Sequence, residues 1–223
     1  LYDKNGEQKW ETLVGGSAAD TFNSVIVSSN GGYVAVGTSQ SSDGDLENIS
    51  KGSKDGVVAK FDNSGNLEKI VTIGGSDTDE LKDVIMTYDR GYLAVGYSHS
   101  TDGDLENLNK GTDRDAIIVK LDKDLNIEWI DRAGGSGGDA AVKKMDEFSS
   151  VMTSSDGGYL AVGYSNSTDG DLENISKGSK DALMVKYSSD GTKEWVKTYG
   201  GLDDDVFTSI AKAHNKSTSS DKD

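Results

Sequence analysis

The chain has 223 residues, 28 of them Gly, with neither Cys nor Pro and a formal net charge of −16. Nucleic acid is disfavoured as a partner, because binding the phosphate backbone needs Lys and Arg to displace its counterions. The lack of Cys excludes disulfides, thiolate metal sites and thiol catalysis. No run is long and apolar enough to cross a bilayer, so we expect no membrane insertion.

One repeat of about 60 residues organises the chain. Each copy starts at a Gly-Gly pair, at 15–16, 74–75, 134–135 and 200–201. Four short apolar runs follow, bounded by Gly, Asn, Asp and Ser, and an acidic loop separates the second run from the third. Runs of this length and composition predict strands. We name them strands a, b, c and d.

In chain order, a strand-d segment around Lys9-Trp10 comes first, then three full copies, and then a strand-a segment that ends at about residue 213. Four antiparallel strands repeated in this way predict an all-β fold, a β-propeller built of four-stranded antiparallel blades, with partial strands at both ends. A β-solenoid is the alternative. We expect residues 1–213 to form the array, and 214–223, which lack large apolar residues, to form a polar tail or linker.

The number of repeats determines whether the array can close into a ring. Propellers close with 4–8 blades, whereas this sequence contains three full repeats and two partial ones. The chain is then part of a longer repeat protein, or several chains complete a ring. In either case the terminal strand edges would be exposed unless paired, which predicts self-association through them.

The acidic loop between strands b and c is the strongest candidate for a metal site. It reads Asp-Gly-Asp-Leu-Glu-Asn in every copy, and carboxylates at alternate positions of a turn can wrap Ca²⁺. The alternative is a structural turn, in which the first Asp caps backbone N–H groups and the Leu is a buried plug. The candidate ligands are Asp43, Asp45, Glu47, Asp102, Asp104, Glu106, Asp169, Asp171 and Glu173.

An insertion in the third copy is the candidate for a specific partner site. The segment between Gly-Gly and strand b is seven residues longer there, and residues 140–147 have a helix-forming composition. We expect a short helix on the face that carries the long loops, where binding residues concentrate on rigid scaffolds. The candidate ligand-binding residues are Lys143, Lys144, Asp146 and Glu147.

The order of these landmarks resembles a known family. Asp115-Ala-Ile-Ile-Val-Lys-Leu-Asp122, a turn, a Trp-bearing strand, Gly-Gly-Ser and Asp156-Gly-Gly-Tyr-Leu-Ala-Val-Gly163 resemble the bacterial β-propeller repeat called SBBP, and are similar to the delta-60 repeat. The resemblance covers residues 1 to about 213. It implies a propeller in a secreted or cell-surface bacterial protein, and it transfers no catalytic residue.

These observations together predict a non-catalytic, extracellular binding or adhesion module for a protein or glycan ligand, with Ca²⁺ stiffening its loops. An architectural spacer in a larger surface protein is the alternative. Part of a glycoside hydrolase is a third interpretation, but that chemistry needs two facing carboxylates, and the many loop carboxylates single out no pair. The two histidines, His99 and His214, fall in unrelated positions.

Overall fold

The computed structural model describes residues 1–108, 113–135 and 144–213. Its strands form three separate four-stranded antiparallel sheets, each made of strands consecutive in the chain. The first sheet contains β1 (Asp20–Val27), β2 (Tyr33–Ser39), β3 (Asp55–Phe61) and β4 (Leu67–Ile73). The second contains β5 (Asp79–Met86), β6 (Tyr92–Ser98), β7 (Asp115–Leu121) and β8 (Ile127–Ala133). The third contains β9 (Asp146–Thr153), β10 (Tyr159–Ser165), β11 (Asp181–Tyr187) and β12 (Lys193–Tyr199).

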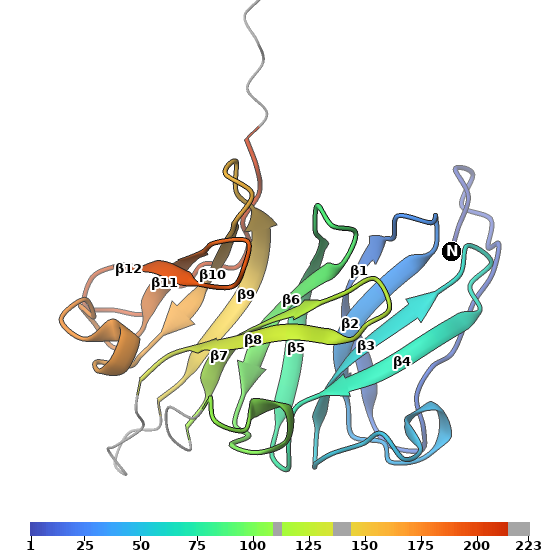
Figure 1. The fold of residues 1–223 in the computed structure, drawn as a ribbon, viewed down its shortest axis with the longest axis horizontal. Helices are drawn as coiled ribbons and strands as arrows, with labels where there is room; N and C mark the ends of the chain where they lie inside the picture. Colours follow the sequence, from blue (N-terminus) through green and yellow to red (C-terminus); the bar gives the residue numbers. More distant parts are fainter. Residues whose placement is uncertain (109–112, 136–143, 214–223) are drawn as a thin grey trace, which may run out of the picture.

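The three sheets stand side by side (Figure 1), and β1, β5 and β9 contact one another in turn. The all-β prediction and the order of strands a to d are therefore confirmed. The short hairpin turns lie along one edge of the array, which we call the turn edge. The long loops between the second and third strands lie along the other, which we call the loop edge.

The hydrophobic core lies between neighbouring sheets. Leu81 and Val84 on β5 pack against the first sheet at Val36 and Val58, and all four side chains are at most 1% exposed. The second and third sheets repeat this contact through residues on β9 and β6. The sheet-to-sheet packing explains why strands b and c read as almost continuous apolar runs: both of their faces are covered.

The tyrosine that opens strand b packs between repeats at both internal junctions. Tyr92 is 2% exposed and Tyr159 is 3% exposed. The ring of Trp129, on β8 of the second sheet, lies 6.3 Å from that of Tyr159 in the third. Trp10 lies 5.5 Å from Tyr33 in the same way, although no complete sheet precedes it.

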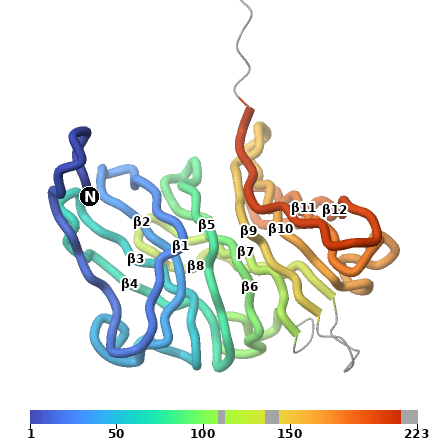
Figure 2. The backbone as a smooth tube through the Cα atoms, turned by 180° about the vertical axis from the view of Figure 1, so that it is seen from behind, coloured from blue at the N-terminus to red at the C-terminus, as the bar shows by residue number. Residues whose placement is uncertain are grey.

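The two partial repeats are not strands. Residues 9–14 and 206–211 lie alongside the first and third sheets (Figure 2) but belong to no sheet. In the complete repeats strand d pairs with strand c, and strand a with strand b. Tyr2 forms one isolated antiparallel bridge with Gln8, and the N–H of Phe207 donates to the Gly163 carbonyl (3.1 Å). In the described residues neither pairing extends into a ladder, so neither segment becomes a strand.

Candidate functional site

Each acidic loop folds into one turn of 3-10 helix on the loop edge. The turns are η1 (Gly44–Leu46), η2 (Gly103–Leu105) and η3 (Gly170–Leu172). The leucine of each turn is buried, with exposed fractions of 1%, 0% and 1% along the chain. This confirms the interpretation of the leucine as a plug. The asparagine that follows has a positive φ in all three loops, 64° at Asn48, and Asn tolerates this conformation better than most residues.

The two aspartates of the loop bind backbone groups of the Gly-Gly segment. Asp43 accepts a hydrogen bond from the N–H of Ser17 (2.7 Å), and Asp45 accepts one from Gly15 (3.0 Å). The backbone N–H of Asp45 donates in turn to the Gly15 carbonyl (3.0 Å). Asp102 and Asp104 make the same contacts in the second repeat. In the third, Asp171 again accepts from the first glycine of the pair.

These contacts explain the electrostatics of the first aspartate. The N–H of Ser17 lowers the pKa of Asp43, and that of Ser76 lowers the pKa of Asp102. Both carboxylates are thus ionised well below neutral pH. They cap backbone N–H groups, as the structural interpretation expected, and the groups that they cap lie in the neighbouring Gly-Gly segment.

The Gly-Gly pair has no room for side chains, because the loop aspartates lie directly against its backbone. A Cβ on Gly16 would lie 2.2 Å from Asp43 Oδ1, and a Cβ on Gly75 would lie 2.2 Å from Asp102 Oδ1. The Gly-Gly pair and the acidic loop are therefore two halves of one structural clasp, which recurs once per repeat.

A third aspartate completes the clasp. Asp79, at the start of β5, is fully buried and accepts from Ser100 Oγ (2.8 Å) and the N–H of Gly75 (3.0 Å). Burial raises the pKa of Asp79 against these bonds. Its counterpart Asp20 is less buried, so that there the Ser39, Gly16 and Ser41 bonds outweigh burial and lower the pKa.

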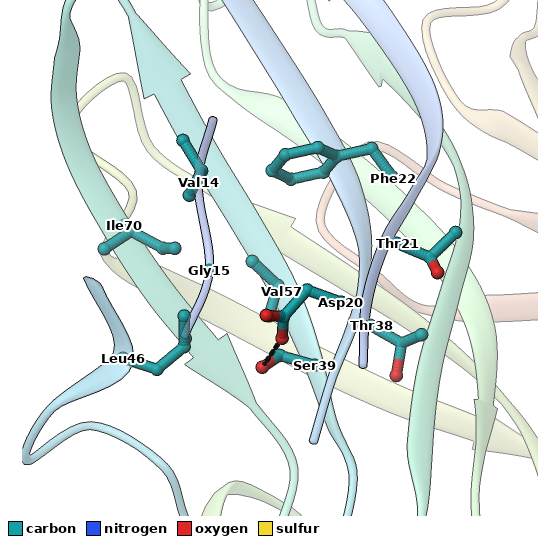
Figure 3. A pocket seen from close by; sticks show the side chains of 10 residues that line it. All are labelled: Val14, Gly15, Asp20, Thr21, Phe22, Thr38, Ser39, Leu46, Val57 and Ile70. Carbon is teal, nitrogen blue, oxygen red and sulfur yellow. Dashed lines mark hydrogen bonds between the residues drawn. The ribbon is translucent and has the colours of Figure 1, made fainter. Parts of the chain in front are cut away.

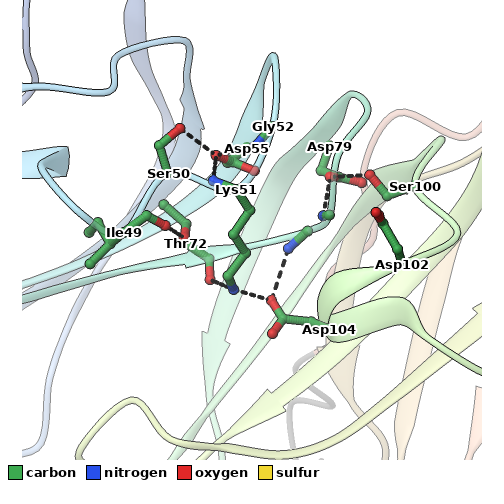
Figure 4. A network of polar contacts seen from close by, with 12 residues as sticks. Ile49, Ser50, Lys51, Gly52, Asp55, Thr72, Asp79, Ser100, Asp102 and Asp104 are labelled. Atoms are coloured by element: carbon green, nitrogen blue, oxygen red, sulfur yellow. Dashed lines mark hydrogen bonds and ion pairs between the residues drawn. The ribbon is translucent and has the colours of Figure 1, made fainter.

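Neighbouring sheets are also linked along the loop edge (Figure 4). Lys51, in the first acidic loop region, donates to the Thr72 carbonyl (2.7 Å) and pairs with Asp104 of the second sheet. Asp104 also binds the N–H of Gly74. The Asp104 carboxylate thus takes part both in the clasp of the second repeat and in the contact between the first and second sheets.

A second set of charges links the sheets near their first strands. Lys54 pairs with Glu80 (2.5 Å), and Arg114 pairs with Glu147 at the corresponding place in the next junction. Burial opposes ionisation of Glu80, but bonds from Lys54 and Lys82 outweigh it and lower the pKa of Glu80 to about 2. Tyr97 donates to Glu80 (3.0 Å), and burial followed by that negative charge raises the pKa of Tyr97 to about 12.

The structure corrects the prediction for the insertion. Asp146 and Glu147 lie in strand β9, not in a helix. Asp146 is fully buried and accepts from Ser167 Oγ (2.8 Å), so it is the third-repeat counterpart of Asp79. Glu147 is 8% exposed and ion-paired, so neither residue is displayed for a ligand. Lys143, and residues 140–142 with it, lie outside the described residues.

Lys144 falls within the described range 144–213 and lies beside the loop edge. Its backbone N–H donates to Asp113 (3.2 Å), and its Nζ donates to the Asn166 carbonyl (3.4 Å). Lys144 is therefore the one predicted ligand-binding residue in the described ranges that lies outside strand β9.

The loop glutamates differ from the loop aspartates. Glu47, Glu106 and Glu173 are exposed in all three repeats, whereas their leucine neighbours are buried. Within the described ranges, no three Asp, Glu, His or Cys side chains converge in a group that could hold a metal ion. Each clasp thus carries one exposed glutamate, next to its buried leucine, on the loop edge.

A small cavity opens on the first sheet, between Val14, Phe22, Val57 and Ile70 (Figure 3). Its volume is about 40 Å³, far below the roughly 300 Å³ at which small-molecule pockets begin. Among residues 1–108, 113–135 and 144–213, no helix is long and apolar enough to cross a membrane.

A comparison of the chain with protein-family models found no match, and a comparison with curated proteins found none either. The resemblance to the SBBP and delta-60 repeats therefore stays a prediction from the sequence motifs.

Proposed function

We propose that the chain is a non-catalytic binding module of a secreted or cell-surface bacterial protein, and that it binds a protein or glycan partner through its loop edge. The observation that carries the proposal is that one exposed glutamate per repeat stands on a rigid clasp, along the same edge of all three sheets. Rigid scaffolds that hold such loops are common sites of binding.

We further infer that the three sheets are consecutive blades of a β-propeller. Two features support this: the strand order is the same in each sheet, and the first strands β1, β5 and β9 contact one another in turn. In a propeller the first strands line the central axis, and all b–c loops emerge on one side of the disc. The repeated glutamates would then face one partner together.

The charge of the loop edge favours a partner that presents cationic or hydroxyl-rich groups. The whole chain carries a net charge of −16, and such a field attracts cationic surfaces and repels anionic ones. Ca²⁺ bound by the loops is the other way to balance these charges. Because Asp43 and Asp45 already accept backbone N–H bonds, calcium would have to share them with the clasp.

Binding can be tested with matched charge variants. The triple variant Glu47→Gln, Glu106→Gln, Glu173→Gln removes three charges from the loop edge. Its control, Glu68→Gln, Asp124→Asn, Glu194→Gln, removes three exposed charges elsewhere. Both should be screened on a glycan array and on immobilised basic and neutral proteins. Loss of a wild-type signal in the first variant alone supports the proposal.

Two results would contradict it. Equal loss of signal in both variants would mean that the interaction depends on net charge and not on the loop edge. No signal from the wild-type chain on any surface would favour an architectural spacer instead. Calcium is tested separately, by melting scans with millimolar Ca²⁺ or with chelator. A bound ion raises Tm by mass action, and an unchanged Tm would remove calcium from the account.

A further inference from the structure

The two junctions inside the chain show what normally covers one face of a repeat. In each, the first strand of a sheet inserts two apolar side chains into the sheet before it. Leu81 and Val84 of β5 are 0% and 1% exposed, and Phe148 and Val151 of β9 are 0% and 3% exposed. The preceding sheet receives them through its second and third strands, for example at Val36 and Val58.

The first sheet carries the same pair without a sheet in front of it. Phe22 aligns with Leu81 and Phe148, and Val25 aligns with Val84 and Val151. Phe22 is 41% exposed and Val25 is 62% exposed. The small cavity of Figure 3 borders Phe22. This face therefore has the composition of an interior junction but stands open, as interaction surfaces do.

The third sheet, at the other end, has the matching receptor face. Leu160, Val162 and Met184 align with the receiving residues of the first sheet. Residues 204–210 lie against this sheet as an incomplete first strand. The N–H of Asp205 donates to the Lys180 carbonyl (2.8 Å), as that of Asp79 does to the Lys54 carbonyl (2.7 Å).

That segment is a weak substitute for a first strand. In the described part of the chain no following strand pairs with it to make a sheet, its bond to β10 is that of the Phe207 N–H to the Gly163 carbonyl (3.1 Å), and Val206 on it is 47% exposed. A segment held by few buried contacts opens at low free-energy cost. A complete first strand, already paired in its own sheet, would bury more apolar surface at the same place.

The charges at the two ends are also complementary. At the junction between the first and second sheets, Lys51 pairs with Asp104. Lys177 is the counterpart of Lys51 in the third sheet and is exposed. Asp45 is the counterpart of Asp104 in the first sheet and is exposed as well. Docking the first sheet on the third would bring this pair together.

We propose that the first sheet of one molecule docks on the third sheet of a second copy of this chain, with β1 in the place of residues 204–210 and β12 in the place of residues 9–14, whose Trp10 now packs on Tyr33. The two surfaces differ, so the contact is head to tail, and it builds either a closed ring or a growing chain of molecules. The inference does not depend on the proposed binding function of the loop edge.

The test is sedimentation velocity of the full chain, from low micromolar to several hundred micromolar. We expect concentration-dependent assembly. Val25→Asp places a charge at the buried centre of the junction and should weaken assembly by at least about tenfold. Val27→Asp is the matched control. Val27 is also 62% exposed, but its counterpart Met86 stays 42% exposed in the internal junction. This control should assemble as the wild type does.

A charge reversal gives an independent measurement. Lys177→Glu should weaken assembly, and Lys123→Glu, an equal change of charge on the exposed c–d turn of the second sheet, should not. Because all four positions are exposed in the single molecule, unchanged melting curves will show that the variants fold. A wild-type chain that stays monomeric at every concentration would overturn the inference. Assembly that survives Val25→Asp, or that is lost equally in Val27→Asp, would also overturn it.

Discussion

The leucine plug offers the sharpest test of how the acidic loops are held. Leu105 is fully buried and belongs to the core between the first and second sheets. Leu105→Ala removes the transfer free energy of that side chain and leaves a cavity that two packed sheets cannot readily close. We expect a loss of about 3–5 kcal/mol in the free energy of unfolding, the upper part of the range for buried leucines.

Leu46 provides the internal comparison. It is equally buried, at 1% exposure, but it borders the existing cavity of about 40 Å³ on the open face of the first sheet. Neighbouring groups can relax into the space there, so Leu46→Ala should cost about 2 kcal/mol, near the lower limit for such substitutions.

Both losses can be measured by urea unfolding, followed through the intrinsic fluorescence of Trp10, Trp129 and Trp195. The slope of the free energy against urea should be the same in all variants, so that the differences report stability. A loss below about 1 kcal/mol for Leu105→Ala, or a larger loss for Leu46→Ala than for Leu105→Ala, would refute the packing argument.

Substitutions at three further positions test the clasp and its links. Asn107 has a φ of 69°, so Asn107→Ala should cost about 1 kcal/mol, whereas Asn107→Gly should stay near wild type; equal losses in thermal unfolding would contradict this. Lys51→Met breaks the pair with Asp104 and should cost less than about 1 kcal/mol, with a difference that shrinks in high salt; a salt-independent loss would assign the effect to packing. Burial raises the folded-state pKa of Asp79, so its ionisation opposes folding and its protonation favours it. The contribution of Asp79 to the free energy of unfolding should therefore become more favourable as pH falls through its folded-state pKa toward the unfolded value of about 4. Asp79→Asn should remove this contribution, so urea titrations at several pH values should give a pH slope that differs from that of the wild type; identical slopes would count against the assignment.

The sequence period was sufficient to predict the strands because each repeat supplies its own pattern. The prediction that an acidic loop separates the second strand from the third agrees with β2 ending at Ser39 and β3 starting at Asp55. The partial repeats were mispredicted as strands for a physical reason: a strand needs a ladder of paired residues. The segment around Trp10 has one isolated bridge, between Tyr2 and Gln8, and the segment around Phe207 bonds to β10 only through the Gly163 carbonyl.

The clasp was only half visible in the sequence. The acidic loop stood out by its composition, but its carboxylates act on Gly15 and Ser17, about 26–30 residues away. A signal existed: Asp20, Asp79 and Asp205 each follow the first glycine of the pair by five residues. The insertion hid the same relation for Asp146, which was therefore assigned to a ligand site and not to the framework.

The most direct test of the account is the placement of the acidic loops on one edge of successive sheets. The chain has no cysteine, so spin labels can be introduced in pairs at chosen positions and their separation measured by pulsed dipolar spectroscopy. Seven-residue strands span about 23 Å, and we expect a separation of this order between Glu47 on the loop edge and Ser64 on the turn edge of the same sheet. We predict a shorter distance between labels at Glu47 and Glu106, in neighbouring sheets, than between labels at Glu47 and Ser64. The reverse order would place the loops on different sides of the molecule and contradict the account.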